Sequence, residues 1–129
     1  MPGMKSAGVL SEKPHLFGKV LVLTALPGSQ GVYGLLIAIL TLSKINFFGG
    51  GIEVSHEAGL QFLWAGILMG ISAFASAIMQ GKVAAAGVGT VSRQESMGGK
   101  AIVLAVIIET YAIFGLLIAL LVVNSVQVG

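Results

Sequence analysis

The chain has 129 residues, of which 56% are hydrophobic and 9% are charged, and its formal net charge is +2. Soluble domains carry about 25% charged residues, so this composition excludes an ordinary soluble protein and indicates an integral membrane protein. The seven basic residues are spread along the chain, which gives nucleic-acid binding no support. Because the chain has no cysteine, disulfides, thiolate metal sites and a cysteine nucleophile are excluded.

The N-terminal stretch, residues 1–17, is short and mixed in polarity. It lacks the apolar run of about 7 to 15 residues that a signal peptide needs. Ser11–Phe17 is predicted to be a polar loop, because Pro14 has no amide donor and restricts Lys13 to extended angles. We interpret residues 1–17 as the remnant of a first helix followed by this cytoplasmic loop.

Residues 18–43 form the first predicted transmembrane helix. Pro27 in its interior removes one backbone hydrogen bond and should disturb the helix, which membrane helices tolerate when neighbours satisfy the freed carbonyl. The following loop, residues 44–56, contains three consecutive glycines, Gly49–Gly51, and is predicted to be extracytoplasmic.

The second predicted transmembrane helix, residues 57–91, is longer than the roughly 20 residues that a bilayer requires. Residues 92–98 form a polar loop, and residues 99–126 form the third span. The predicted fold is therefore all-α, an integral membrane helical hairpin bundle with three transmembrane helices. Small residues three or four positions apart mark one face of the second span and predict close helix packing: they are Gly66, Gly70, Ala73, Ala77, Gly81 and Ala84.

One carboxylate, Glu109, interrupts the apolar stretch of the third span, which runs for 23 residues from Ala101 to Val123. A stretch of this length crosses a hydrocarbon core of roughly 30 Å, so Glu109 lies at mid-membrane depth. A carboxylate at that depth costs at least about 2.5 to 3.5 kcal/mol on insertion scales, which makes an ion or proton site the first hypothesis. The alternative is a protonated acid that only hydrogen-bonds a neighbouring helix.

The basic residues predict the orientation of the chain. Six of the seven lie on one side of the predicted spans. The positive-inside rule therefore places the N-terminus and the 92–98 loop in the cytoplasm, and the glycine-rich loop and the C-terminus outside the cell membrane. The six residues are Lys5, Lys13, Lys19, Lys82, Arg93 and Lys100, and Lys44 is the exception.

An internal repeat relates the first and third spans. Sliding the sequence by 81 positions aligns Gly34–Ala38 with Gly115–Ala119, and both read Gly-Leu-Leu-Ile-Ala. In this register Gly28 takes the place of Glu109, so only one copy keeps the carboxylate.

A duplicated unit of helix, polar loop and helix predicts a further span before the first one. Ser6–Val9 resembles Ala85–Val88, which lies near the end of the second predicted helix. We therefore expect that the printed sequence lacks most of this further span.

Three runs of sequence resemble one protein family. They are Leu26–Gly34, Gln80–Gly87 and Glu109–Gly115, and they resemble the membrane rotor proteolipids of V-type ATPases, in particular the bacterial subunit K of the sodium-translocating kind. The resemblance covers the chain from Ser6 onward. It implies four spans made of two hairpins, with one carboxylate in the last span, and assembly into a homo-oligomeric membrane ring.

The residues around Glu109 offer the oxygen atoms that an alkali cation requires. Positions 26, 29, 30 and 33 follow the spacing i, i+3, i+4, i+7 and share one face of the first span. A hard cation needs several oxygen ligands, and we predict that hydroxyl, amide and carboxylate oxygens supply them to Na⁺. The alternative for the two glutamines is a plain hydrogen bond between helices. The predicted ligands are Ser29, Gln30, Gln80 and Glu109.

The resemblance assigns further roles at this site. It implies that Leu26 contributes its backbone carbonyl and that Ser29 stands where the family commonly has threonine. It also implies that Gln30 and Gln80 coordinate the ion and that Tyr33 hydrogen-bonds Glu109 to lock the occupied site.

The resemblance also implies a rotary function. Glu109 would carry Na⁺, or H⁺ as the alternative, across the membrane as the ring turns past an arginine of a stator subunit. The loops Ser11–Phe17 and Ser92–Gly98 would dock a central-stalk subunit. The chain has no catalytic nucleophile or phosphate-binding loop, so ATP hydrolysis or synthesis would belong to partners. Two alternatives remain open: a degenerate non-transporting membrane assembly protein, and a small proton-coupled transporter dimer.

Overall fold

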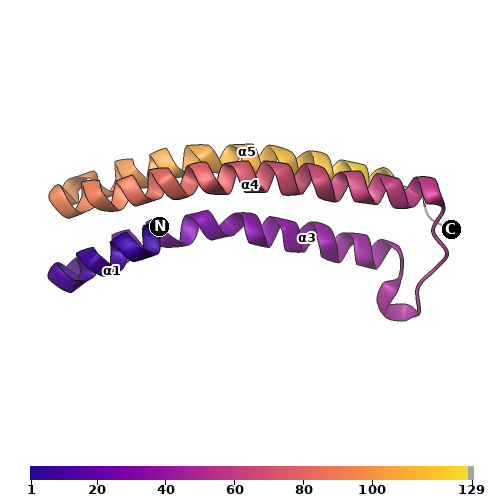
Figure 1. The fold of residues 1–129 in the computed structure, drawn as a ribbon, viewed down its shortest axis with the longest axis horizontal. Coiled ribbons are helices and arrows are strands. Elements are labelled where there is room, and N and C mark those ends of the chain that lie inside the picture. The colour runs from indigo at the N-terminus through magenta and orange to yellow at the C-terminus, as the bar shows by residue number, and fades with distance from the viewer. Residues whose placement is uncertain (128–129) are drawn as a thin grey trace. The chain divides into compact units, whose positions relative to one another are not determined.

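The computed structural model describes residues 1–127. Three helices in this part of the chain are long and apolar enough to cross a membrane: Pro14–Lys44, His56–Arg93 and Glu95–Ser125. Figure 1 shows them as long coiled ribbons, with α4 uninterrupted along its whole length. The all-α prediction with three transmembrane helices is confirmed.

A short 3₁₀ turn stands between each two successive helices, and between α3 and α4 an irregular stretch, residues 51–55, follows it (Figure 1). Short turns stand at 14–16, 26–28, 47–49 and 95–97. The α-helices are α1 (Pro2–Glu12), α2 (Phe17–Ala25), α3 (Ser29–Lys44), α4 (His56–Arg93) and α5 (Gly98–Ser125).

The predicted disturbance at Pro27 is a 3₁₀ turn, Leu26–Gly28, that separates α2 from α3. Proline has no amide hydrogen to donate to the carbonyl four residues earlier. Two residues after Pro27, the Ser29 amide donates to Leu26 O, three residues before it, in the tighter 3₁₀ pattern. The backbone angles on both sides stay helical, so the first span continues through the break.

The internal repeat is visible in the backbone. The helix ends Glu12 and Arg93 lie 81 positions apart, as do the ends Lys44 and Ser125. The residue after Glu12 and the residue after Arg93 make the same backbone hydrogen bond to the carbonyl four residues earlier. Lys13 N donates to Val9 O and Gln94 N donates to Thr90 O, both at 2.8 Å. The two copies therefore share their helix boundaries as well as their sequence.

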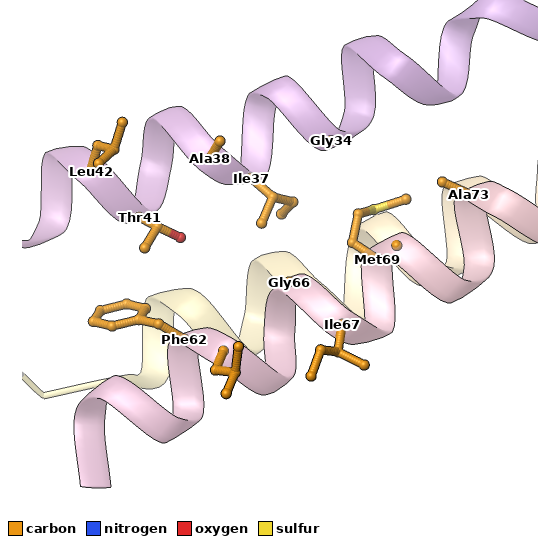
Figure 2. A pocket seen from close by; sticks show the side chains of 12 residues that line it. Gly34, Ile37, Ala38, Thr41, Leu42, Phe62, Gly66, Ile67, Met69 and Ala73 are labelled. Atoms are coloured by element: carbon orange, nitrogen blue, oxygen red, sulfur yellow. The ribbon is translucent and has the colours of Figure 1, made fainter. Parts of the chain in front are cut away.

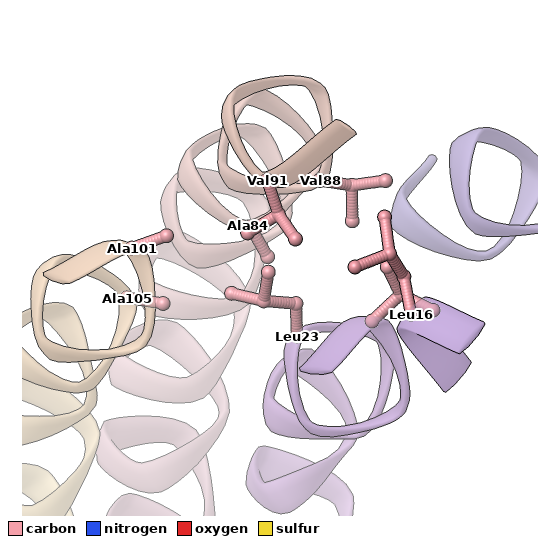
Figure 3. Packing of buried hydrophobic residues seen from close by; sticks show 8 residues of the cluster. Leu16, Leu23, Ala84, Val88, Val91, Ala101 and Ala105 are labelled. Atoms are coloured by element: carbon pink, nitrogen blue, oxygen red, sulfur yellow. The ribbon is translucent and has the colours of Figure 1, made fainter. Parts of the chain in front are cut away.

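The chain divides into two compact units, each with its own core. The first comprises Met1–Gln30 and Ala75–Thr110. Its core consists of large aliphatic side chains that meet alanines of α4 and α5 (Figure 3), and the small residues let the helices approach closely. The buried members are Leu16, Val20, Leu23, Ala84, Val88, Val91, Ala101 and Ala105.

The loops of the first unit are joined by basic side chains. Lys13 Nζ donates to Ser92 O in the last turn of α4, where helical carbonyls lack backbone partners. Lys19 Nζ donates to Glu95 O at 2.8 Å, and His15 Nε2 lies 2.6 Å from the Glu95 carboxylate. These contacts hold the loop after α1 against the loop after α4.

The second unit comprises Gly31–Phe74 and Tyr111–Gly129. Its buried core is Ile37, Ala65, Met69, Ala119 and Val123. Lys44 Nζ donates to the carbonyls of Val123 and Asn124, at 2.7 and 2.5 Å, and so satisfies the C-terminal turn of α5.

Gly115 allows α5 to approach α4 closely in the second unit. A methyl group added there would collide with the side chain of Ser72, both at Cβ and at Oγ. At Gly34, 81 positions earlier, an added methyl group would meet no atom within 4 Å. The repeat therefore has a close helix contact in one copy and an open face in the other.

That open face lines an apolar groove of about 570 Å³ between α3 and α4 (Figure 2). Gly34 and Ala38 lie on one side of it, and Gly66, Gly70 and Ala73 lie on the other. The sequence predicts that the small residues of α4 pack closely against a helix, but within this chain Gly66 and Gly70 are exposed. The reason is that Ala65 and Met69, on the neighbouring face of α4, make the core contact instead.

Candidate functional site: a carboxylate held by three helices

Glu109 is buried in the first unit, with 6% of its surface exposed. Its carboxylate has a partner at each oxygen. Gln80 Nε2 of α4 donates to Oε2 at 2.6 Å, and the Ser29 hydroxyl of α3 lies in short hydrogen-bonding contact with Oε1. A charge-assisted hydrogen bond offsets part of the cost of burying a carboxylate, which explains how α5 keeps this residue in an apolar span.

Gln80 is fully buried and links α4 to α5 and to α3. Its Nε2 donates to Ala105 O at 3.0 Å as well as to Glu109, and its Oε1 accepts from Gln30 Nε2 at 2.7 Å. Gln80 therefore meets the carboxylate through its amide nitrogen, and its oxygen is occupied by Gln30.

Gln30 is 4% exposed and donates both of its side-chain amide hydrogens to residues of α4. One goes to Gln80 Oε1 and the other to Ser76 Oγ at 3.0 Å. Ser76, 2% exposed, in turn donates to Ile108 O at 3.2 Å. The four amide hydrogens of the two glutamines thus all have acceptors, and no buried side-chain polar atom among the described residues lacks a partner.

Oxygen atoms gather around the Ser29 hydroxyl. Leu26 O lies 2.8 Å from Ser29 Oγ, Gln30 Oε1 lies 3.3 Å from it, and Glu109 Oε1 is in short contact. The 3₁₀ turn made by Pro27 places Leu26 O in this group, because the turn brings the carbonyl within reach of the side chain three residues later.

This arrangement can hold either a proton or a cation. Ser29 has one hydrogen for three acceptors, so it donates to Glu109 when the carboxylate is ionised. When Oε1 carries a proton, Glu109 donates to Ser29 and the Ser29 hydrogen turns to Leu26 O. The oxygens of Leu26, Ser29, Gln30 and Glu109 are hard ligands of the kind that alkali and alkaline-earth ions select, so a cation in place of that proton stays a prediction.

The structure brings together five of the six predicted site residues, which are Leu26, Ser29, Gln30, Gln80 and Glu109. Tyr33 belongs to the second unit, where it packs against the core around Ile37, and its bond to Glu109 stays a prediction. The ligand roles also remain predictions.

Sequence reasoning missed Ser76. Its position one turn before Gln80 on the same helix was the available signal.

Comparison with known proteins agrees with the internal repeat. The profile of the ATP synthase C-subunit family matches residues 1–41 and 63–122. The chain belongs to the ATP synthase C-subunit family. The two matched stretches of this family member end at 41 and 122, which are 81 positions apart, so the family match follows the internal repeat.

Several related proteins align with this chain over most of its length. It is 40% identical to the V-type sodium ATPase subunit K of Enterococcus hirae over 126 residues, which are 97% of this chain and 78% of the relative. It is 43% identical to the A-type ATP synthase subunit K of Methanocaldococcus jannaschii over 98% of this chain, and it spans about half of that relative, 53%. It is 29% identical to the V-type proton ATPase 16 kDa proteolipid subunit of Chrysotila carterae, over 92% of this chain and 72% of the relative.

Proposed function

We propose that this chain is a subunit of the membrane rotor ring of a V-type ATPase and that Glu109 carries the transported ion. The observation that carries the proposal is a buried carboxylate in the middle of a spanning helix, with partners from two other helices. The relatives named as subunits K of a sodium ATPase and of an ATP synthase support it.

Sodium is the ion that the side chains favour. A proton site needs only the carboxylate and one partner, and here Ser29 supplies that partner. The Gln30 oxygen adds nothing to proton binding, and together with Leu26 O it would replace the water lost by a cation. Relatives are named as both sodium and proton ATPases, so H⁺ is the competing cargo.

Transport follows from exchange at Glu109 during rotation. The ion enters from one aqueous path and neutralises the carboxylate, and the neutral site then passes lipid at a much lower cost than a bare charge. An arginine of a stator subunit stabilises the ionised carboxylate and favours release into the second path. Partner subunits supply ATP hydrolysis or synthesis.

The ring proposal predicts a large oligomer. All three spans expose large apolar side chains, including Leu35, Ile71, Phe74, Leu104 and Phe114, each at least 59% exposed in the single chain. After extraction in mild detergent, the protein should migrate in SDS gels as one large, SDS-resistant species that heating with acid or solvent dissociates. Monomers or dimers alone would contradict the ring and would favour an assembly factor or a small dimeric transporter.

We propose that the N-terminus and the loop at 92–98 face the cytoplasm, where the loops joined by Lys13, His15 and Lys19 dock the central stalk. The basic residues at these loops support this orientation. Lys44, on the opposite side, donates hydrogen bonds to the carbonyls at the end of α5.

Single cysteines test the orientation, because the natural chain has none. Ser96 is exposed in the loop after α4, and Ser96→Cys should react with a membrane-impermeant maleimide only in inverted vesicles. Gly50 has φ 104°, so a side chain there is strained, and the exposed Glu53 of the same loop is the better position. Glu53→Cys should react only in intact cells. The reverse pattern would invert the proposed orientation.

A further inference from the structure

We infer that Ser76 is a positioning residue for the ion site, because it holds the Gln30 amide with its oxygen, and not its nitrogen, toward Ser29 and Glu109. The inference rests on the proposed function of Glu109 as the ion carrier. Ser76 is 2% exposed, so its hydroxyl has no water to bond and must use protein partners.

The direction of the Ser76 hydroxyl is set by a backbone carbonyl. Ile108 O lies 3.2 Å from Ser76 Oγ and can only accept, so the single hydrogen of Ser76 points toward α5. The Ser76 oxygen is then an acceptor, and Gln30 Nε2 at 3.0 Å is the donor that meets it. An amide oxygen turned toward Ser76 would find no hydrogen there.

A second chain of hydrogen bonds leads to the same orientation. Ala105 O also can only accept, and it takes a hydrogen from Gln80 Nε2 at 3.0 Å. Gln80 Oε1 therefore turns toward Gln30 and accepts from Gln30 Nε2 at 2.7 Å. Two carbonyls of α5 thus orient the Gln30 amide, one through Ser76 and one through Gln80.

The orientation of the Gln30 amide decides which of its atoms the proposed cation would meet. With both hydrogens of Nε2 engaged on α4, Gln30 Oε1 lies 3.3 Å from Ser29 Oγ, the same hydroxyl that contacts Glu109 Oε1. An amide NH₂ in that place would repel a cation. A proton on Glu109 Oε1 needs only Ser29 beside it, so Ser76 should affect sodium binding more than proton binding.

The test measures sodium protection of Glu109 in membranes that contain the whole complex. Dicyclohexylcarbodiimide attacks only a protonated carboxyl, so bound sodium slows labelling. Ser76→Ala removes one of the two acceptors that hold Gln30, and the NaCl concentration for half-protection should rise about two- to tenfold. The pH dependence of labelling without sodium should stay unchanged. Ser76→Thr keeps the hydroxyl and should restore protection, while Ser76→Cys, with a weak acceptor, should shift protection in the same direction as Ser76→Ala.

A matched control and a double-mutant cycle separate positioning from packing. Ser72→Ala removes a hydroxyl of the same helix that donates to the preceding turn, at Leu68 O, and it should leave protection unchanged. If Ser76 acts through Gln30, Ser76→Ala should have no further effect in a Gln30→Ala background.

Two results would overturn the role of Ser76: wild-type protection in Ser76→Ala, or additive effects of the two substitutions. Labelling of the unmodified protein that ignores sodium would instead refute the sodium function itself, and the inference with it.

Discussion

Glu109→Gln is expected to abolish ion transport while the chain still inserts and assembles. Glutamine is nearly isosteric and can accept from Gln80 at one atom and donate to Ser29 at the other, as the protonated acid does. What is lost is the negative charge. Two unit charges 4 Å apart attract by about 4 kcal/mol at an effective dielectric constant near 20, or about a thousandfold in affinity.

The measurement is ATP-driven uptake of radioactive sodium by vesicles in which this chain is the only rotor proteolipid. Uptake should fall to background in Glu109→Gln, and the SDS-resistant oligomer should persist. Glu57→Gln is the matched control, because Glu57 is an exposed glutamate in the first turn of α4. Uptake near the unmodified level in Glu109→Gln would show that another group carries the ion.

Much of the site could be predicted because helical periodicity and membrane depth are properties of the sequence. A lone carboxylate in an apolar span must find partners, and positions 26, 29 and 30 share a face whatever the neighbouring helix does. The internal repeat is likewise visible in the sequence, and in the structure the two copies end their helices at equivalent residues, Lys44 and Ser125.

The orientation of hydrogen bonds could not be predicted in the same way. Ser72 and Ser76 are four residues apart on one helix, yet Ser72 bonds its own backbone at Leu68 and Ser76 bonds Ile108 of the next helix. Gln80 is predicted to offer its oxygen to the ion, and this role stays a prediction; in the structure its nitrogen donates to Ala105 O and to Glu109, and its oxygen accepts from Gln30.

The helix partner of a small-residue face could not be predicted from the sequence either. The small residues of α4 predict a close contact, but the residue that permits one between α4 and α5 in the second unit is Gly115, which is not in that stripe. Gly66 and Gly70 instead line an open groove. Spacing identifies a face that can pack closely, and it does not identify which helix covers that face.

Gln80→Ala is expected to weaken sodium binding more than any other substitution that keeps Glu109. It removes the 2.6 Å hydrogen bond to the carboxylate and leaves Gln30 Nε2 with one acceptor fewer in a buried site. Hydrogen bonds to charged groups contribute about 1.5 to 3 kcal/mol, so the sodium concentration for half-protection should rise about 10- to 100-fold. Gln61→Ala, an exposed glutamine on the same helix, should leave it unchanged.

The most direct test of the central claim is the rate at which dicyclohexylcarbodiimide labels Glu109, measured against NaCl concentration at several pH values, with choline chloride keeping the ionic strength constant. If sodium and a proton compete for Glu109 Oε1, sodium should slow labelling, and less sodium should be needed as pH rises. Gln80→Ala should require more sodium at every pH. Labelling rates that do not respond to sodium at any pH would contradict a sodium site and would leave a proton-driven rotor.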